Sequence, residues 1–374
     1  MKLMHLSDLH LGKRLNGFSL LDDQKYILDR ILEIAEEQNP DCVLIAGDIY
    51  DKTVPPEEAV ALFDDFLTAL SARALPVLLI SGNHDSAERI AYGGRIMERS
   101  GIYLSPAYHG EIKPVILHDA LGEICFWMLP FVRRADVRQA FPDRSIVSYT
   151  DAIRTAVEAM PIDPTKRNVL LAHQYVAGAE LCESEEIYIG MAENISAELF
   201  APFDYTALGH LHMPQNVENN PRIRYCGTPL KYSFSEISHR KSVSLVTLGE
   251  KGSLPVLAEI PLIPKRDMLE LRGSFTELIG QGSDCYVSLV LTDEIPVTDA
   301  IGKLRKRFPN VMALRYDNTR SSTIIDRTAL TSGDLKTPAE LFEEFYQTVN
   351  GSPMPEEQQE RIETLIKEIW EGEA

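Results

Sequence analysis

The chain has 374 residues, 44% of them hydrophobic and 25% charged, and its formal net charge at pH 7 is −19. That length allows two or three domains with a full apolar core. No apolar run reaches membrane-spanning length and the N-terminus shows no signal-peptide pattern, so we expect a cytoplasmic protein with no membrane partner.

The cysteines and the distribution of charge indicate the cellular compartment and the kinds of binding partner that the chain could have. The five cysteines are scattered with no paired spacing, which favours a reducing compartment and argues against a disulfide framework or a thiolate zinc site. An acidic chain is by itself a poor partner for nucleic acid, because phosphate contacts need Lys and Arg. Residues 340–374, however, hold ten Glu against Arg361 and Lys367, a net charge of −8, so the body is less acidic than the total suggests.

The first part of the chain alternates between apolar strands and amphipathic helices. Strands are predicted at residues 2–7, 42–47, 76–81, 124–129, 168–173 and 205–210. Apolar residues at helical spacing predict a helix over 20–37, and Pro55 and Pro56 begin a second helix. This alternation predicts a layered α/β domain in which both faces of the sheet are covered.

The composition changes near residue 262. Residues 262–267 read as a linker, and residues 268–315 follow the order strand, helix, strand, helix, strand, which indicates a small α+β domain. Beyond the polar stretch 319–334, a capping box at Thr337–Glu340 and a stripe from Ile362 to Trp370 predict two tail helices. The stripe favours docking to a partner, although it could also pack on the chain's own body.

Polar residues follow five of the predicted strands. They are Asp8 and His10, Asp48 and Asp51, Asn83, His84 and Asp85, His173, and finally His210 and His212. Because ligands bind at the carboxyl ends of strands in an α/β sheet, we expect these groups to meet in one crevice. Any one of these motifs could simply form a turn, since Gly, Asn and Asp are common in turns. Together, however, the oxygen and imidazole groups are too many for one ion and suit two Mn²⁺, Fe²⁺ or Zn²⁺ ions bridged by a carboxylate.

The ordered motifs DxH (8–10), GDxxD (47–51), GNHD (82–85), a lone His173 and GHxH (209–212) resemble the calcineurin-like metallophosphoesterase family. GTPLKYSFSE (227–236), HRKS (239–242), the small second domain and the Glu-rich tail are similar to the SbcD-type nuclease subunits of that family. The resemblance implies a metallophosphoesterase sandwich at 1–262, a smaller α+β cap domain at 263–333 and a C-terminal helical tail at 334–374.

The resemblance also implies the roles of the site residues. One metal would be held by Asp8, His10, Asp48 and His212, and the second by Asp48, Asn83, His173 and His210. Asp48 would bridge two divalent ions, with Mn²⁺ as the working metal, and His84 would act on the substrate as a general acid. The role of Asp51 stays open, because some archaeal relatives carry a histidine at that position.

The implied activity is that of a two-metal phosphodiesterase, a double-strand DNA exonuclease and single-strand endonuclease acting on DNA ends and hairpins. An SbcC-type ABC ATPase would bind the tail helices, and residues 86–101 would form a homodimer within a heterotetramer. Candidate DNA contacts are Lys13, Arg14, Arg89, Lys231, Arg240 and Lys241, although for any one of them a solvated surface charge is the favoured interpretation. The motifs alone also allow a stand-alone phosphodiesterase or phosphatase for nucleotides or small esters, or a scaffold without catalysis.

Overall fold

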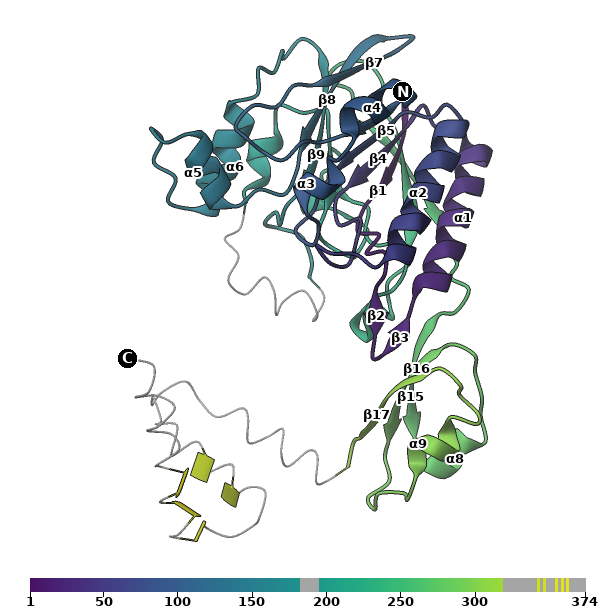
Figure 1. Cartoon of the computed structure of the whole chain (residues 1–374). Helices are drawn as coiled ribbons and strands as arrows, with labels where there is room; N and C mark the ends of the chain where they lie inside the picture. The colour runs from purple at the N-terminus through teal and green to yellow at the C-terminus, as the bar shows by residue number, and fades with distance from the viewer. Residues whose placement is uncertain are drawn as a thin grey trace. The chain divides into compact units, whose positions relative to one another are not determined.

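Two six-stranded β-sheets pack face to face in the computed structural model of the chain (Figure 1). The structure describes residues 1–181 and 195–318, together with ten tail residues at 342–343, 346–347, 354–355, 358–359 and 361–362. Met1–Tyr316 forms one compact unit. The two predicted tail helices fall almost wholly outside the described residues, so their docking role stays a prediction, as do the boundaries at 262/263 and 333/334.

The first sheet has the strand order β14-β13-β1-β4-β5-β6. Its strands are β1 (Lys2–Leu6), β4 (Cys42–Ala46), β5 (Val77–Ile80), β6 (Ile102–Leu104), β13 (Ser242–Thr247) and β14 (Val256–Pro261). The strands β1, β4, β5 and β6 run parallel, as their separation by helices predicts. Two strands that were not predicted from the sequence, β13 and β14, extend the sheet antiparallel beyond β1.

The second sheet has the order β11-β12-β10-β9-β8-β7. Its strands are β7 (Val115–Asp119), β8 (Gly122–Leu129), β9 (Arg167–His173), β10 (Tyr205–Gly209), β11 (Gln215–Asn216) and β12 (Ile223–Tyr225). The central strands β8, β9, β10 and β12 are parallel, whereas β7 and β11 pair antiparallel at the two edges. The carboxyl ends of β9 and β10 therefore lie at one edge, next to each other.

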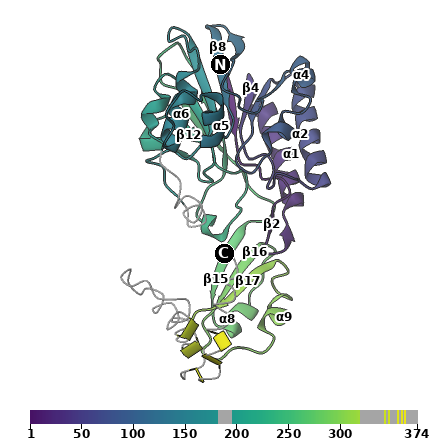
Figure 2. The ribbon, with the colours of Figure 1, turned by 60° about the vertical axis from the view of Figure 1, so that its left-hand side comes forward.

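Helices cover the outer face of each sheet, on opposite sides of the sandwich (Figure 2). The first sheet carries α1 (Leu21–Gln38) and α2 (Glu57–Ala72), and the second carries α5 (Arg134–Ala140) and α6 (Tyr149–Glu158). Shorter elements are the hairpin β2 (Arg14–Leu15) and β3 (Phe18–Ser19), α3 (Ala87–Ile90) and α4 (Gly94–Met97). None of the described helices is long and apolar enough to span a bilayer.

This layering explains why the strands read as continuous apolar runs. Successive side chains of a strand point to opposite faces. Leu3 and Leu44 are buried against the second sheet, while their neighbours Met4 and Ile45 are buried against the helices. Each such side chain contributes about 1.5–3 kcal/mol to folding, so both faces of the strands hold the sandwich together. The predicted fold class, a layered α/β sandwich, is confirmed.

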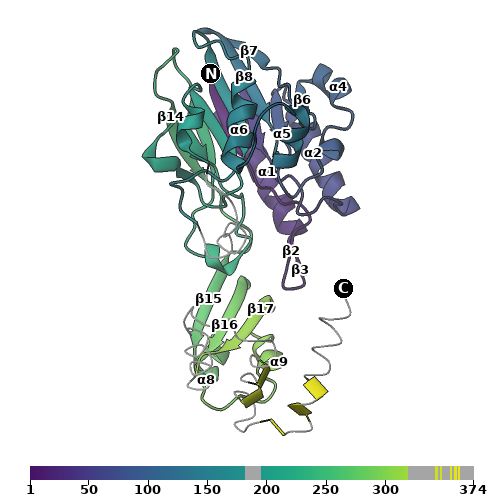
Figure 3. The same ribbon diagram turned by 90° about the vertical axis from the view of Figure 1, so that its left-hand side faces the viewer.

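Beyond the sandwich lies a small three-stranded parallel sheet in the order β15-β16-β17 (Figure 3). Its elements are β15 (Met268–Gly273), α8 (Phe275–Ile279), β16 (Tyr286–Leu291), α9 (Ala300–Leu304) and β17 (Val311–Tyr316). The helices cover one face through a core that includes Leu278, Leu289, Leu304 and Phe308. The expected order of strand, helix, strand, helix and strand is present.

A buried carboxylate ties this small sheet to the sandwich. Asp23, in the first turn of α1, accepts hydrogen bonds of 2.6 Å from both the Tyr286 hydroxyl and the Arg266 guanidinium. Lys231 and Asp267 form a second ion pair, with 2.8 Å between Nζ and Oδ1. The Asp23 side chain is only 2% exposed, and its Oδ2 atom joins α1 to Arg266 of the linker and to Tyr286 of the small sheet.

We predict that Asp23→Ala exposes the linker to protease. A hydrogen bond to a charged group contributes about 1.5–3 kcal/mol, and every 1.4 kcal/mol is tenfold in an opening equilibrium. Cleavage by trypsin after Lys265 or Arg266 should therefore accelerate by at least about tenfold, measured by peptide mass spectrometry over time. Asp29→Ala, an exposed change on the same helix, should leave the rate unchanged. Equal rates in both variants would show that Asp23 does not hold the linker.

Candidate metal centre

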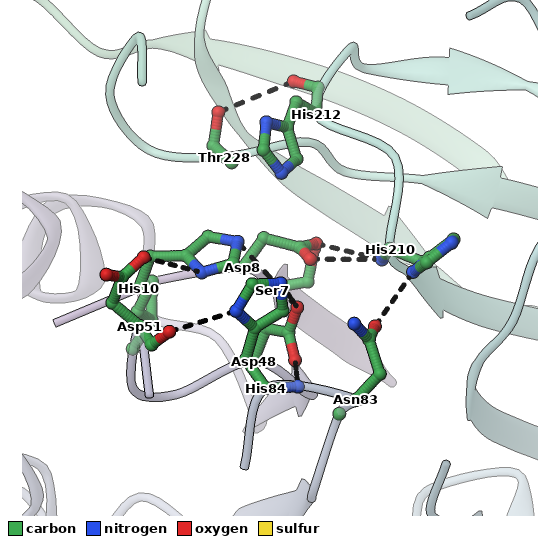
Figure 4. Close-up of polar contacts among 12 residues, drawn as sticks. Ser7, Asp8, His10, Asp48, Asp51, Asn83, His84, His210, His212 and Thr228 are labelled. Atoms are coloured by element: carbon green, nitrogen blue, oxygen red, sulfur yellow. Dashed lines mark hydrogen bonds and ion pairs between the residues drawn. The ribbon is translucent and has the colours of Figure 1, made fainter. Parts of the chain in front are cut away.

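The polar residues predicted from the strand ends meet at one edge of the sandwich (Figure 4). Asp8 and His10 follow β1, Asp48 follows β4, Asn83 and His84 follow β5, His173 ends β9, and His210 and His212 follow β10. The first sheet supplies one half of the cluster and the second sheet the other. The site therefore lies between two sheets rather than at the edge of one.

The backbone at these strand ends adopts a conformation that side-chain-bearing residues rarely take. The φ angles of Asp8, His10, Asp48 and His210 are 53°, 44°, 49° and 106°. Such positive values cost about 1–3 kcal/mol each and persist where the surrounding structure enforces them. The backbone turns sharply after each strand and directs consecutive polar groups into one space.

Glycines beside the ligand candidates allow the two sheets to approach closely. A Cβ atom at Gly82 would lie 2.1 Å from Oδ1 of Asp48, and one at Gly47 would lie 2.4 Å from Nδ1 of His173. A Cβ at Gly209 would lie 1.9 Å from the carbonyl oxygen of Ala46. These distances are far below van der Waals contact, so only glycine fits at the three positions.

Asp48 lies at the centre of the cluster. One of its carboxylate oxygens is 3.4 Å from Nε2 of His173, 3.7 Å from Nε2 of His10 and 4.0 Å from Nε2 of His84. The other oxygen accepts a 2.8 Å hydrogen bond from the backbone N–H of His84. Burial alone would raise the pKa of Asp48, but His173 and the other histidines outweigh it and hold that pKa well below its usual range.

Asp8 brings a second buried carboxylate into the same space. Its two oxygens each accept a 3.1 Å hydrogen bond from the backbone N–H of His210, and the Ser7 hydroxyl donates to one of them. Burial raises the pKa of Asp8 to about 6, with the negative charge of Asp48 adding to the rise and His173 opposing it. Two buried carboxylates this close call for cations between them.

His10 shows most directly that a metal fits this site. Both of its ring nitrogens are buried and have no hydrogen-bond partner among the described residues. Ligand atoms of Asp8, His10 and His212 all lie within 4.8 Å of one another, as do those of Asp8, Asp48 and His173. A divalent ion would satisfy the imidazole nitrogens and balance the carboxylates at once.

A second group of ligand atoms gathers around Asn83. Its side-chain oxygen lies 3.0 Å from both Nε2 of His173 and Nδ1 of His210. The other ring nitrogen of His173 donates to the carbonyl of Ala46 at 2.8 Å, which fixes the ring. Burial alone would lower the pKa of His173, but the Asp48 carboxylate outweighs it and raises that pKa to about 9. In the chain without metal, the raised pKa favours a proton on His173, and this proton offsets the negative charge of the Asp48 carboxylate. A bound cation could offset the same charge instead.

His84 lies beside this cluster. Of the three histidines whose Nε2 atoms lie near the Asp48 carboxylate, it is the most exposed. Its Nδ1–H donates to the carbonyl of Asp51 at 2.9 Å, which leaves Nε2 facing the site. Its side chain is 40% exposed, whereas that of His10 is 2% exposed. The carboxylate of Asp51 pairs with Lys13 at 2.8 Å. Asp51 therefore orients His84 through its main chain, which the sequence analysis had left open.

Two residues without a predicted role form an outer layer of support. The buried Asp85 carboxylate accepts backbone N–H bonds from Ile49, Tyr50 and Gly82, so it joins the loops after β4 and β5. Gln24 of α1 donates at 2.7 Å to the carbonyl of His10. Asp85 was among the residues expected in the crevice, although its backbone contacts were not predicted, while Gln24 carries no signal in the sequence.

The candidate DNA contacts divide into paired and exposed residues. Lys13 pairs with Asp51 and Lys231 with Asp267, whereas Arg14, Arg89 and Arg240 are exposed. The prediction that Lys241 contacts DNA does not hold. Its side chain is 3% exposed and its ammonium lies 2.6 Å from the buried carboxylate of Glu236.

Comparisons with known proteins agree with this geometry. The model of the calcineurin-like phosphoesterase family matches residues 1–214, and that of the type 5 capsule protein repressor C-terminal domain matches residues 264–350. The chain therefore belongs to the calcineurin-like phosphoesterases, a family whose fold and donor set imply divalent metal binding.

Full-length relatives place it more closely. The chain is 32% identical to the SbcD subunit of the nuclease SbcCD from Staphylococcus epidermidis, over 100% of both chains. It is also 32% identical to the same subunit from Staphylococcus saprophyticus, over 99% of both. Within the phosphoesterases the chain thus belongs to the SbcD family.

Solved structures are more distant. The protein TT1561 of Thermus thermophilus is 12% identical with a TM-score of 0.42, covering 69% of this chain and 98% of its own. A dimetal phosphatase from Danio rerio is 11% identical with a TM-score of 0.42, covering 70% of this chain and 96% of its own.

We predict that Gly82→Ala weakens metal binding because the new methyl group displaces Asp48. Disturbing the positioning of a ligand typically costs about 10–100-fold in metal affinity, and a titration with Mn²⁺ should show a loss of that size. Gly94→Ala is the matched control, since its Cβ would meet Leu104 at an ordinary 3.4 Å. Unchanged affinity in Gly82→Ala would show that the position of Asp48 does not govern metal binding.

Proposed function

We propose that this chain is the nuclease subunit of a DNA-processing complex and hydrolyses phosphodiester bonds at DNA ends and hairpins. It would act as a double-strand exonuclease and a single-strand endonuclease in repair and recombination. The observation that carries the proposal is the convergence of carboxylate, amide and imidazole groups on Asp48, in a chain whose full-length relatives are named as the SbcD subunit of the nuclease SbcCD.

Two divalent ions are part of the proposal. Asp8, His10, Asp48 and His212 would hold one ion, and Asp48, Asn83, His173 and His210 the other. The imidazole-rich donor set favours Mn²⁺ over Mg²⁺, which prefers oxygen ligands and retains its water. When bound, such a pair of ions activates water and neutralises charge on the phosphate.

His84 is the residue proposed to act on the substrate. The carbonyl of Asp51 accepts a hydrogen bond from Nδ1–H of the His84 ring, so this proton stays in place. The proton that the ring would donate to the substrate is therefore the one on Nε2, which faces Asp48. The partly exposed ring can reach a leaving oxygen that the more buried ligand histidines cannot. A positioned general acid of this kind typically contributes about 10²–10⁴-fold to the rate.

A cavity beside the cluster supports a polyanionic substrate. It has a volume of about 800 Å³, opens next to Asn83, and is lined by Arg89 and Arg133 among others. Arg89 is exposed, so its guanidinium group is accessible to phosphate, whereas the guanidinium of Arg133 pairs with the Asp136 carboxylate at 3.1 Å. The exposed Arg14 and Arg240 are further candidates for DNA contact.

The partners belong to the proposal as well. An SbcC-type ABC ATPase would bind the tail helices at 334–374, and a second copy of the chain would bind at residues 86–101, giving a homodimer within a heterotetramer. In that segment Tyr92 and Ile96 are 85% and 75% exposed, which suits an interface between proteins. A complex that processes chromosomal DNA would work in the cytoplasm.

The decisive experiment compares substrates in the presence of Mn²⁺. The full chain with its ATPase partner and ATP should degrade linear duplex DNA, and a chain ending at residue 334 should retain its metals but neither bind the ATPase nor respond to it. Activity confined to mononucleotides or small esters would instead favour a stand-alone phosphodiesterase or phosphatase. A truncated chain that still bound the ATPase would move the docking surface away from the tail.

We predict that His84→Ala separates metal binding from chemistry. The variant should keep both ions, because neither proposed ligand set includes His84, and should lose about 10²–10⁴-fold in turnover on DNA. Elemental analysis and single-turnover cleavage measure the two effects. His118→Ala, an exposed histidine paired with Glu123, serves as the control and should change neither. Near-normal turnover in His84→Ala would assign the proton transfer to another group.

A further inference from the structure

A buried ion pair stands directly behind His212. Glu236, at the end of the short turn η4 (Phe234–Glu236), accepts a 3.0 Å hydrogen bond from Nδ1–H of His212. It also accepts a 2.6 Å bond from Nζ of Lys241. The side chains of Glu236 and Lys241 are 0% and 3% exposed, so neither charge is shared with solvent.

Lys241 also fixes the main chain that carries this histidine. Its ammonium donates at 2.8 Å to the carbonyl oxygen of His212 and at 2.6 Å to the hydroxyl of Thr228. The backbone N–H of Thr228 donates to that same carbonyl at 3.2 Å, and Figure 4 shows the two residues side by side. Ring and backbone of His212 are therefore both held by the segment 228–241.

This arrangement differs from that of the other site histidines. His173 donates its Nδ1–H to the carbonyl of Ala46, and His84 donates to the carbonyl of Asp51. His212 instead directs its Nδ1–H, the nitrogen that faces away from the ligand cluster, to a buried carboxylate. A carboxylate behind a ligand histidine fixes its tautomer and strengthens it as a donor.

We propose that Glu236 and Lys241 are a positioning pair that sets the affinity of one of the two metal sites through His212. The carboxylate holds the proton on Nδ1 and so presents Nε2 as the ligand atom. The lysine balances the carboxylate, so that the pair adds no net charge to a site that must admit a phosphodiester. This inference rests on the proposed function only in taking His212 as a metal ligand.

A purely structural role for the pair makes a different prediction. Replacing a buried ion pair by neutral groups of similar volume is often neutral for stability, whereas removing one partner leaves an unpaired buried charge. Glu236→Gln, which nearly preserves the shape, and Lys241→Met should therefore each lower the melting temperature. The double variant should recover much of that loss, because no unpaired charge remains.

The test measures metal affinity beside melting temperature in the full chain, with Mn²⁺ as the probe. Glu236→Gln should bind one of its two ions about 10–100-fold more weakly, the loss typical for partners of ligand histidines. Electron paramagnetic resonance should then show uncoupled Mn²⁺ where the unsubstituted chain shows a coupled pair. The double variant should regain melting temperature but not metal affinity.

A matched control lies at the far end of β9 from His173. Asp119 there pairs with the buried Arg167, and Asp119→Asn should lower the melting temperature without changing either metal affinity. Recovery of metal affinity together with stability in the double variant, or an equal loss in Asp119→Asn, would overturn the proposal. If the unsubstituted chain bound no more than one ion, both the proposed two-metal function and the role of the Glu236–Lys241 pair would be wrong. Two ions bound normally in Glu236→Gln would overturn the role of the pair alone.

Discussion

The Asp48 carboxylate is the constraint around which the rest of the site is arranged. It is buried with a second carboxylate, Asp8, close by, and a buried charge is costly unless it is paired and hydrogen-bonded. The histidines, the backbone N–H of His84 and the glycines that let them approach supply part of that compensation. Divalent cations would supply the remainder, so their binding free energy would also be folding free energy.

The sequence could predict which residues come together in the candidate metal centre. It could predict only part of the structural reason why they do so. Polar residues after apolar strands correctly indicated a common crevice, by the rule for a single open sheet. In the structure β1, β4 and β5 belong to one sheet and β9 and β10 to another, and the crevice forms because the two sheets pack face to face. That packing depends on pairings between distant segments, such as β1 with β13, which local patterns do not encode.

The outer layer of the site was harder to foresee for a similar reason. Arg240 and Lys241 are neighbours in the HRKS segment, yet the first is exposed and the second buried. Lys241 directly precedes β13 and is buried because its ammonium donates to the carbonyl of His212, the hydroxyl of Thr228 and the carboxylate of Glu236, three groups that come from other segments. The HRKS motif therefore correctly drew attention to Lys241, but the sequence could not predict which groups this residue contacts.

The distribution of the basic residues also bears on how this chain would hold DNA. Among the six candidate DNA contacts, Lys13, Lys231 and Lys241 each face a carboxylate, which leaves the exposed Arg14, Arg89 and Arg240. Each neutralised phosphate contributes roughly −0.9 to the slope of log affinity against log salt, so a few arginines give weak and only mildly salt-dependent binding. A tail that carries ten Glu between residues 340 and 374 would repel phosphate and suits a protein partner better. If the proposed function holds, the partner would retain the DNA, while this chain would act on a single phosphodiester through the residues around Asp48.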